Sequence, residues 1–463
     1  MSLLAGAACV AALLVAGWWP MRAWAPGLAG PTLTGRMSVA FALGAAIAGL
    51  VLVLLSALGM PAHPAVLGVL ALGSALLLRG RPGAEPAAPA SPAATADPAG
   101  GVARLPRGFA ALLLVVALVS TGASVGLPFR SDGSKFWAPR ARDLAEVGAA
   151  HAPSLHDPGR LGVHRNYPLL VPALMAPAFT LSPPDAVAGP KLVLAALTLA
   201  LLGVLAVQLL RCGARGGLLL LVFATLPFLV GTDVRESAVS GGFVDSAEAL
   251  FLLLVVAGAE ALRRGAAQGA DRTLLVTGLF GAALASTKLE GAAELGLVAI
   301  AWLLTGPLRR PVLPWLALVL LLWVPTLVIR AGASPEEAGF TAESLTDGST
   351  LLARGVPVLA GVGSLLLDVS CFGLLPPLVL LWLLPRAGAP EARGTRTFAL
   401  WLLAGAAGFL LVSYLATTMH TGRHIHTSAH RLAWHWLPAL ALLAARVRAD
   451  GGERPASPAR VPS

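Results

Sequence analysis

Apolar segments recur along almost the whole chain, and short polar segments rich in arginine or in mixed charge separate them. Runs such as 110–126 and 192–210 are long enough to cross a hydrocarbon layer of about 30 Å as a helix. The alternation of apolar and polar residues that membrane β-strands require is not seen. The pattern therefore predicts an all-α polytopic membrane protein, because helices satisfy their own backbone hydrogen bonds in lipid.

The same pattern places membrane helices along the chain. They are expected near residues 3–19, 37–58, 64–78, 108–127, 189–210, 216–231, 242–262, 273–288, 291–306, 312–330, 370–385, 398–418 and 432–446. Residues 350–367 are also apolar, but a full span there would move the arginines of 386–396 to the other side of the membrane. We therefore predict a re-entrant or interfacial helix at 350–367, within an external loop over 331–368.

A stretch rich in proline and alanine, 82–98, divides the chain into two unequal parts. The stretch lacks the large apolar side chains that a folded core requires, and arginines flank it. We therefore expect a flexible cytoplasmic linker. The predicted organisation is an N-terminal three-helix membrane part, the linker, a large transmembrane domain and a disordered cytoplasmic tail. These parts cover residues 1–78, 79–107, 108–446 and 447–463.

Composition supports the membrane prediction and fixes an orientation. Only 12% of the residues are charged, against about 25% in soluble domains. The net charge of +10 comes from arginines in short clusters between apolar segments, the pattern of cytoplasmic loops. Since these arginines form no basic face with interleaved aromatic residues, nucleic-acid binding is not expected. The three cysteines lie in or beside apolar segments and indicate neither a disulfide framework nor a zinc site.

With this orientation, nearly all carboxylates and all nine histidines gather on the external side or at the membrane level just below it. The cytoplasmic loops carry little but arginine. We therefore expect a multi-pass protein of the bacterial inner membrane whose active site faces the extracytoplasmic side.

The loop that follows the predicted helix 108–127 is the most informative external segment. Pro139 suits the first turn of a helix, and 138–147 carries charged and apolar residues on opposite faces. A short amphipathic helix at the membrane interface is predicted there. Asp132 lies just beyond the preceding span, where its carboxylate faces a membrane-embedded cleft, or alternatively caps a helix or pairs with Arg130 or Lys135.

Two further groups of charged residues lie close to predicted helix ends. Asp245 stands at the start of a membrane helix, and Glu248 lies one turn deeper on the same face. Carboxylates within membrane helices are energetically costly and usually functional. Lys288 and Glu290 lie at the external tip of a helical hairpin, where they belong to a site or form a mutual salt bridge.

Five short motifs follow one another in a characteristic order. They are Asp132 with Trp137 and Arg140-Ala141, then Tyr-Pro-Leu-Leu-Val-Pro at 167–172, Gly-Phe-Val-Asp at 242–245, Thr-Lys-Leu-Glu-Gly at 287–291, and Ser-Ala-His-Arg at 428–431 before Pro438. In this order they resemble a bacterial branch of the GT-C superfamily, polytopic glycosyltransferases that use polyprenyl-phosphate-linked sugars. The resemblance covers roughly residues 108–446 and is to enzymes related to the protein O-mannosyltransferase and aminoarabinose transferase type.

The chain departs from this family at several positions. The family usually places the tryptophan closer to the aspartate, whereas residues 133–136 intervene here. Arg140 stands where lysine is common, the histidine-rich segment 420–430 has no counterpart, and the helices of 1–78 are additional.

The resemblance implies a GT-C-like bundle of about ten helices, with about three extra N-terminal helices and short interfacial helices in external loops. It implies a hexosyl- or pentosyltransferase that moves sugar from a polyprenyl-phosphate-linked donor to a lipid or glycan acceptor, among membrane lipids, on the extracytoplasmic face. Asp132 is the expected general base, within hydrogen-bond reach of the acceptor hydroxyl.

The other residues of the implied site have supporting roles. Asp245 is expected to orient sugar hydroxyls or one of the cations, and Arg140, Lys288 and Arg431 to bind the leaving phosphate. The remaining substrate-binding candidates are Lys135, Trp137, Tyr167 and Glu290. No Asp-x-Asp or Asp-Glu pair accompanies Asp132, so a metal-independent reaction is expected, although a divalent metal is compatible with the sequence.

Three alternatives remain open. A secondary transporter or lipid flippase would use polar residues near the bilayer midplane and matched repeats, whereas the carboxylates here crowd one edge. A ligase or polymerase for O-antigen-like glycans also uses external arginines and histidines, and the segment 420–430 keeps this alternative open. In a zinc enzyme, His420 with His424, or His426 with His430, would share a helix face, but Thr421 and Gly422 favour a loop there.

Overall fold

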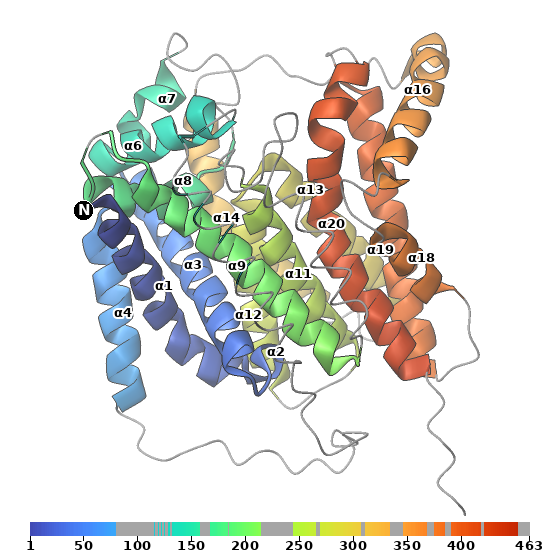
Figure 1. Cartoon of the computed structure of the whole chain (residues 1–463), viewed down its shortest axis with the longest axis horizontal. Helices are drawn as coiled ribbons and strands as arrows, with labels where there is room; N and C mark the ends of the chain where they lie inside the picture. The colour runs from blue at the N-terminus through green and yellow to red at the C-terminus, as the bar shows by residue number, and fades with distance from the viewer. Residues whose placement is uncertain are drawn as a thin grey trace, which may run out of the picture.

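The computed structural model describes residues 1–79, 128–129, 132–157, 167–183, 185–213, 244–264, 269–306, 311–333, 346–367, 375–384, 390–417 and 421–451, with isolated positions between 115 and 125. All its regular elements are helices (Figure 1). In chain order they are α1 (Ser2–Trp24), α2 (Pro26–Ala29), α3 (Leu33–Ala57), α4 (Pro64–Arg79), η1 (Gly133–Trp137), α6 (Ala138–Glu146), η2 (Ala149–His151), α7 (Pro153–His156), α8 (Leu170–Thr180), α9 (Ala188–Arg211), α11 (Asp245–Arg263), α12 (Ala270–Ala285), α13 (Leu289–Thr305), α14 (Val312–Gly332), α16 (Gly348–Leu367), α18 (Leu375–Leu383), α19 (Pro390–Leu415) and α20 (Thr421–Gly451).

Within the described residues, five helices are long and apolar enough to cross a membrane. They are α1, α3, α9, α14 and the greater part of α19. Their length and composition agree with the prediction of an all-α, multi-pass membrane protein. The predicted helix 216–231, nearly all of 108–127, and most of the linker and the tail lie outside the described residues.

The helical boundaries follow the apolar runs closely. The predicted helix 189–210 is α9, and the amphipathic segment predicted at 138–147 is α6, with Pro139 in its first turn. Residues 350–367 are helical as α16, which packs against α19 and α20 at one end of the molecule (Figure 1).

One local prediction was wrong. Thr421 and Gly422 were expected to lie in a loop, but α20 begins at Thr421. Ile425 and Ala429 of this first part of α20 pack in a small apolar cluster with residues of α16 and α19, including Tyr414. This packing outweighs the low helix propensity of glycine, a difference of only about 1 kcal/mol from alanine. The same helix also continues beyond the predicted end at 446, to Gly451.

The N-terminal helices belong to the same core as the rest of the protein. A Cβ atom on Gly17 of α1 would collide with the backbone of α3, and one on Gly44 of α3 with the backbone of α1. Gly6 of α1 approaches Gly189 of α9 in the same way, with 2.6 Å between the position of a Cβ and the carbonyl oxygen of Gly189. Small residues therefore let these helices pack backbone to backbone, as is common in membrane bundles.

Helix α11 lies in the middle of the bundle, against α9, α12, α13 and α20 (Figure 1). Almost all its residues are buried. The charged residues at its two ends are therefore shielded by the helices around it.

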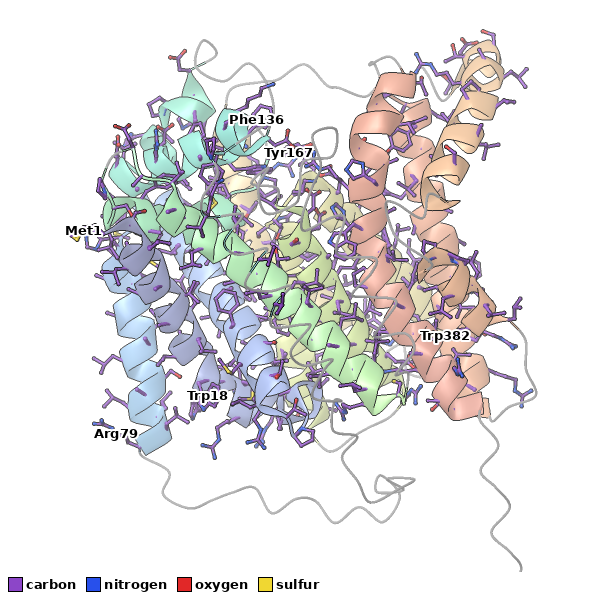
Figure 2. The ribbon with its side chains drawn as sticks, viewed as in Figure 1. Met1, Trp18, Arg79, Phe136, Tyr167 and Trp382 are labelled. Carbon is purple, nitrogen blue, oxygen red and sulfur yellow. The ribbon has the colours of Figure 1, made fainter. Side chains whose placement is uncertain are left out.

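Charged residues are distributed unequally between the two ends of the bundle. Arg79 lies at one end, and Phe136 and Tyr167 lie at the other (Figure 2). Arginines at the Arg79 end bind helix termini there: Arg211 Nη1 donates to the carbonyl of Gly27, and Arg272 Nη1 to that of Ala23. Both ends also carry charges of the opposite sign, among them Glu260 and Asp450 at the first and Lys288 and Arg431 at the second, and the orientation across the membrane stays a prediction.

Candidate functional site

Charged side chains from four separate segments meet where α11 begins. They come from the residue before η1, the first turn of α11, the turn and first helical turns that follow α12, and α20. We call them the Asp245 cluster, which consists of Asp132, Asp245, Glu248, Lys288, Glu290, Glu294, Arg431 and His435.

Asp245 is the centre of this cluster and is fully buried. Its Oδ1 accepts a hydrogen bond from Lys288 Nζ at 3.0 Å and lies 2.9 Å from His435 Nε2, where the tautomer of the ring decides whether this nitrogen donates. Its Oδ2 accepts from Arg431 Nε at 3.0 Å and lies 3.0 Å from Nη2 of the same guanidinium. The position at the first turn of α11 adds the favourable helix dipole. Asp245 thus contacts Lys288 and Arg431 at the same time, while its role in a reaction stays a prediction.

Lys288 occupies the turn between α12 and α13. Besides Asp245, its ammonium lies 3.7 Å from Glu248 Oε2 and 3.8 Å from Glu290 Oε1. Burial opposes the charged form, but the carboxylates of Asp245, Glu290 and Glu248 outweigh it and raise the pKa of Lys288 above its ordinary value. The ammonium is therefore charged, and its pairing with Glu290 is one contact in a larger network.

Arg431 links the buried part of the cluster to its exposed edge. Its Nη1 lies 2.8 Å from Asp132 Oδ2, while its other contacts reach Asp245. The side chain of Asp132 is 26% exposed and that of Arg431 is 13% exposed, whereas Asp245 is 0% exposed. The accessible edge of the cluster therefore consists of Asp132, Glu290, whose side chain is 21% exposed, and Arg431.

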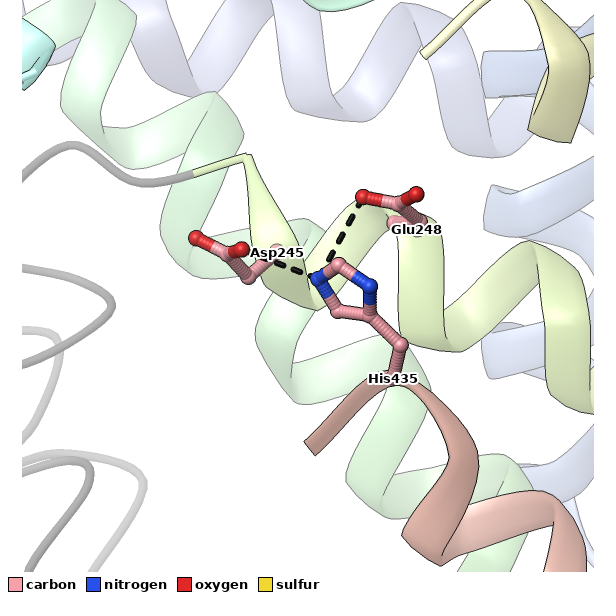
Figure 3. A group of neighbouring side chains, drawn as sticks. All are labelled: Asp245, Glu248 and His435. Carbon is pink, nitrogen blue, oxygen red and sulfur yellow. Dashed lines mark hydrogen bonds and ion pairs between the residues drawn. The ribbon is translucent and has the colours of Figure 1, made fainter. Parts of the chain in front are cut away.

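The sequence did not point to Glu294 and His435 as members of the site. His435 Nδ1 lies 2.9 Å from Glu294 Oε1. On the other side of the ring, Nε2 lies 3.3 Å from Glu248 Oε2 and 2.9 Å from Asp245 Oδ1 (Figure 3).

His435 is 190 positions from Asp245, so their contact could not be read from the sequence. A local signal was nevertheless present, because Glu294 lies one turn after Glu290 on α13 and His435 one turn after Arg431 on α20. A second signal is the cost of placing a carboxylate or a histidine within a membrane helix.

The aromatic candidates form a neighbouring group. The rings of Trp137 and Tyr167 lie 5.8 Å apart, and the guanidinium carbon of Arg140 lies 5.8 Å from the Trp137 ring centroid. Burial and the charge of Glu290 raise the pKa of the Tyr167 phenol above its ordinary value, against the opposing charges of Lys288 and Arg431. Tyr167 therefore lies within electrostatic reach of the cluster as a neutral hydrogen-bond donor.

Three of the predicted substrate-binding residues are not brought to the accessible edge of the cluster. Arg140 is 0% exposed and Trp137 is 1% exposed, so both lie beneath the surface. Lys135 is exposed on the π-helical turn η1. The structure thus brings Asp132, Asp245, Lys288, Glu290 and Arg431 together but leaves these three at the periphery.

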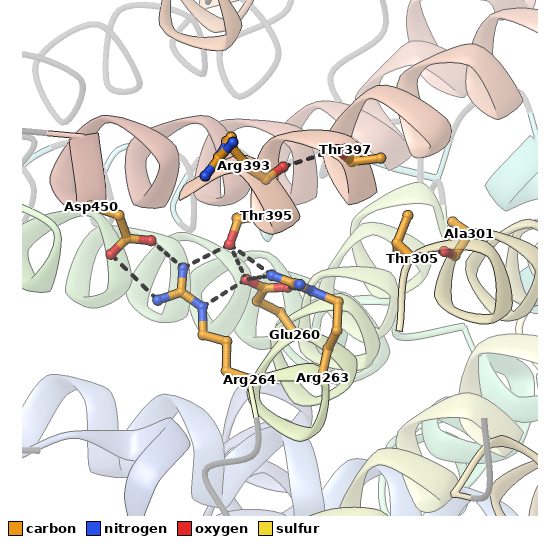
Figure 4. Close-up of polar contacts among 9 residues, drawn as sticks. All are labelled: Glu260, Arg263, Arg264, Ala301, Thr305, Arg393, Thr395, Thr397 and Asp450. Atoms are coloured by element: carbon orange, nitrogen blue, oxygen red, sulfur yellow. Dashed lines mark hydrogen bonds and ion pairs between the residues drawn. The ribbon is translucent and has the colours of Figure 1, made fainter. Parts of the chain in front are cut away.

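A second buried polar cluster lies near the other end of α11, about 22 Å from Asp245 at the helical rise of 1.5 Å per residue. We call it the Glu260 cluster, which consists of Glu260, Arg263, Arg264, Thr395 and Asp450 (Figure 4). Glu260 Oε2 accepts from Arg263 Nε at 2.7 Å, and Oε1 accepts from Arg264 Nε at 2.7 Å. The cluster ties α11 to α19 and α20.

Comparison with known proteins does not assign the chain. No protein family, no curated protein and no solved structure matches it. The function is therefore argued from the residues and their geometry.

Proposed function

We propose that this protein is a membrane glycosyltransferase that moves a sugar from a polyprenyl-phosphate-linked donor to a lipid or glycan acceptor. The observation that carries the proposal is the meeting of two carboxylates and two cations, one of each buried and one of each partly exposed. Asp245 and Lys288 are the buried pair, and Asp132 and Arg431 the partly exposed pair. A carboxylate beside cations is what a reaction needs when one oxygen loses a proton and a phosphate leaves.

The cations supply the binding site for the donor phosphate. Arg431 is the better placed of the two, because it is partly exposed and its guanidinium can bind two phosphate oxygens at once. Arg431 and Lys288 are both paired with carboxylates in the structure. When a phosphate binds, it replaces one of these carboxylates as the anionic partner of the cation. Arg140, buried beneath Trp137, is a weaker candidate for this contact.

The same exchange prepares the general base. Arg431 binds Oδ2 of Asp132, and its transfer to the phosphate releases that oxygen beside the bound donor. Asp132 then accepts the proton of the acceptor hydroxyl while the hydroxyl oxygen attacks the anomeric carbon. The bond from that carbon to the phosphate oxygen breaks, and polyprenyl phosphate leaves with its electron pair, stabilised by Arg431 and Lys288.

Within this mechanism Asp245 is a positioning residue. It accepts hydrogen bonds from both cations and is too deeply buried to contact an acceptor. Tyr167, at the side of the cluster, is placed to donate a hydrogen bond to a sugar hydroxyl or phosphate oxygen. Because the buried network holds the cations, little reorganisation is required when the donor binds.

The test is an in vitro transfer assay with purified protein, polyprenyl-phosphate sugars and Asp132→Asn. Loss of a general base lowers the rate by about 10² to 10⁴-fold, with the helical content and membrane insertion unchanged. Asp271→Asn is the matched control, since Asp271 is an exposed carboxylate at the start of α12, outside the cluster. Transfer at the wild-type rate by Asp132→Asn would remove Asp132 as the base.

One observation favours a transporter as the second candidate. Asp245, Glu248, Glu294 and His435 are fully buried in helices of a bundle predicted to span the membrane, a setting used for proton and ion pathways. Substrate flux across proteoliposomes without cleavage of a sugar donor would support this function instead. The ligase or polymerase alternative, which depends on the segment 420–430, stays a prediction; of its histidines, His424 lies 2.8 Å from Thr417, measured from Nδ1 to Oγ1.

A further inference from the structure

We propose that Asp245, Glu248 and His435 form a binding site for a divalent transition-metal cation, Zn²⁺ or Mn²⁺. The inference goes beyond sugar transfer, because cation binding is measurable without any donor or acceptor. Each residue offers one ligand atom, and these atoms all lie within 4.8 Å of one another in the interior of the bundle.

The spacing of the ligand atoms fits a metal. His435 Nε2 lies 2.9 Å from Asp245 Oδ1 and 3.3 Å from Glu248 Oε2 (Figure 3). Metal–ligand distances of about 2.0–2.2 Å put neighbouring ligands about 3 to 3.5 Å apart. A cation therefore fits between these atoms with small movements of the two carboxylates.

The orientation of the histidine ring is that of a metal ligand. Its Nδ1 lies 2.9 Å from Glu294 Oε1, and its Nε2 points at the pair of carboxylates. A neutral imidazole donates from only one ring nitrogen. With Nδ1–H donated to Glu294, the Nε2 lone pair is available to a cation, the arrangement in which a carboxylate commonly orients a metal-binding histidine.

Glu248 provides an independent indication of a missing positive partner. It is fully buried, and within the described part of the chain neither of its carboxylate oxygens makes a hydrogen bond. Its contacts are Lys288 at 3.7 Å and His435 at 3.3 Å. Buried carboxylates are normally hydrogen-bonded or bound to a cation, because an unpaired charge in the interior is strongly unfavourable.

The charge of the whole cluster leads to the same conclusion. The cluster contains five carboxylates but only two permanent cations, Lys288 and Arg431. The carboxylates belong to Asp132, Asp245, Glu248, Glu290 and Glu294. A divalent cation at the proposed site removes most of this excess negative charge.

The donor set selects the kind of metal. One imidazole nitrogen with two carboxylate oxygens suits Zn²⁺ or Mn²⁺ better than Mg²⁺ or Ca²⁺, which prefer oxygen alone. Lys288, whose ammonium lies 3.0 Å from Asp245 Oδ1, competes with the cation for the same oxygen. Removing this ammonium is therefore expected to strengthen metal binding, an effect that a purely structural role of the three ligands does not produce.

The experiment uses the full-length protein in lipid nanodiscs, stripped with EDTA and titrated with ZnCl₂. We expect about one tightly bound zinc per chain by elemental analysis after gel filtration. His435→Gln and Glu248→Gln should each weaken binding by at least about tenfold, and Glu294→Gln by about 10 to 100-fold through loss of ring orientation. His424→Gln, on the same helix but bonded to Thr417, should bind like the wild type.

Two further measurements keep the proposal testable if a variant folds poorly. With Mn²⁺, pulsed EPR of the wild type should detect coupling to a histidine nitrogen, and this coupling should vanish in His435→Gln. Lys288→Gln should bind zinc more tightly than the wild type. Wild-type protein that retains no stoichiometric zinc, or binding that His435→Gln and Glu248→Gln leave unchanged, would overturn the site and identify Lys288 as its permanent cation.

Discussion

The two buried polar clusters of α11 differ in charge balance although the same helix carries both. In the Glu260 cluster two carboxylates face two arginines, and Glu260 accepts hydrogen bonds at both oxygens. In the Asp245 cluster carboxylates outnumber permanent cations, and Glu248 accepts no hydrogen bond within the described residues. A network in which positive and negative charges are equal in number needs no further ion, and here it holds α11 against α19 and α20. A network with excess charge on one side is suited to binding something of opposite charge.

The largest expected effect comes from Glu260→Gln. It leaves Arg263, whose side chain is only 7% exposed, without its charged partner. Breaking a buried ion pair by removing one member lowers stability by about 3 to 5 kcal/mol. Denaturant unfolding in mixed micelles measures the loss, and sugar transfer by the folded fraction should persist. Unfolding at the wild-type midpoint would show that the Glu260 cluster does not fasten α11 to α19 and α20.

Gly394→Ala tests the same fastening from the α19 side. A Cβ there would lie 2.5 Å from Arg263 Nη1, so the guanidinium has to move away from Glu260 and Thr395. Overpacking of this kind lowers stability by about 1 to 3 kcal/mol. Gly408→Ala, on the same helix with no atom near the new Cβ, is the control in the same unfolding assay. Equal stability of the two variants would contradict the close packing described.

Glu248→Gln sharpens the comparison, because it makes the same change as Glu260→Gln on a residue that is equally buried in the same helix. Replacing the carboxylate by an amide lowers the repulsion among the acids of the Asp245 cluster. In EDTA-treated protein we expect the free energy of unfolding to stay within about 1 kcal/mol of wild type. A loss as large as that of Glu260→Gln would mean that the two clusters do not differ in kind.

The smallest effect is expected for Asp450→Asn. Asp450 pairs with Arg264 at 2.5 Å, but the two side chains are 23% and 28% exposed. Ion pairs that reach solvent contribute about 0.2 to 1 kcal/mol, and less at high salt. Unfolding at low and high ionic strength should therefore show a small, salt-dependent difference. A loss of several kcal/mol would place Asp450 among the essential members of the Glu260 cluster.

The sequence predicted the helices well because apolar runs end where the chain leaves the bundle. Helix α9 matches its prediction closely at both ends. The start of α20 was missed, since its histidines and Gly422 resemble a loop and only contacts with α16 and α19 stabilise the helix there. Packing between segments distant in the sequence does not appear in local periodicity.

The candidate site was predictable only in part, for a related reason. Asp132, Asp245 and Lys288 each lie at a helix end, where a charge on the predicted external side is conspicuous. Arg431 was expected just before a helix but lies in the middle of α20. Their mutual contacts depend on how the helices pack, which no single motif specifies. Glu294 and His435 lie deeper in the bundle. Their contact with each other forms only when α13 and α20 pack together, so it could not be predicted from either helix alone.

The π-helical turn η1 gives a consequence for chain-length variation. It occupies 133–137, between Asp132 and the start of α6. A π-helical turn accommodates an additional residue within a helix. Deleting one residue there would turn Asp132 by about 100° around the helix relative to α6, away from Arg431. The π-helical turn therefore fixes the direction in which the carboxylate of Asp132 points, and a single residue lost or gained in this segment is enough to separate it from Arg431.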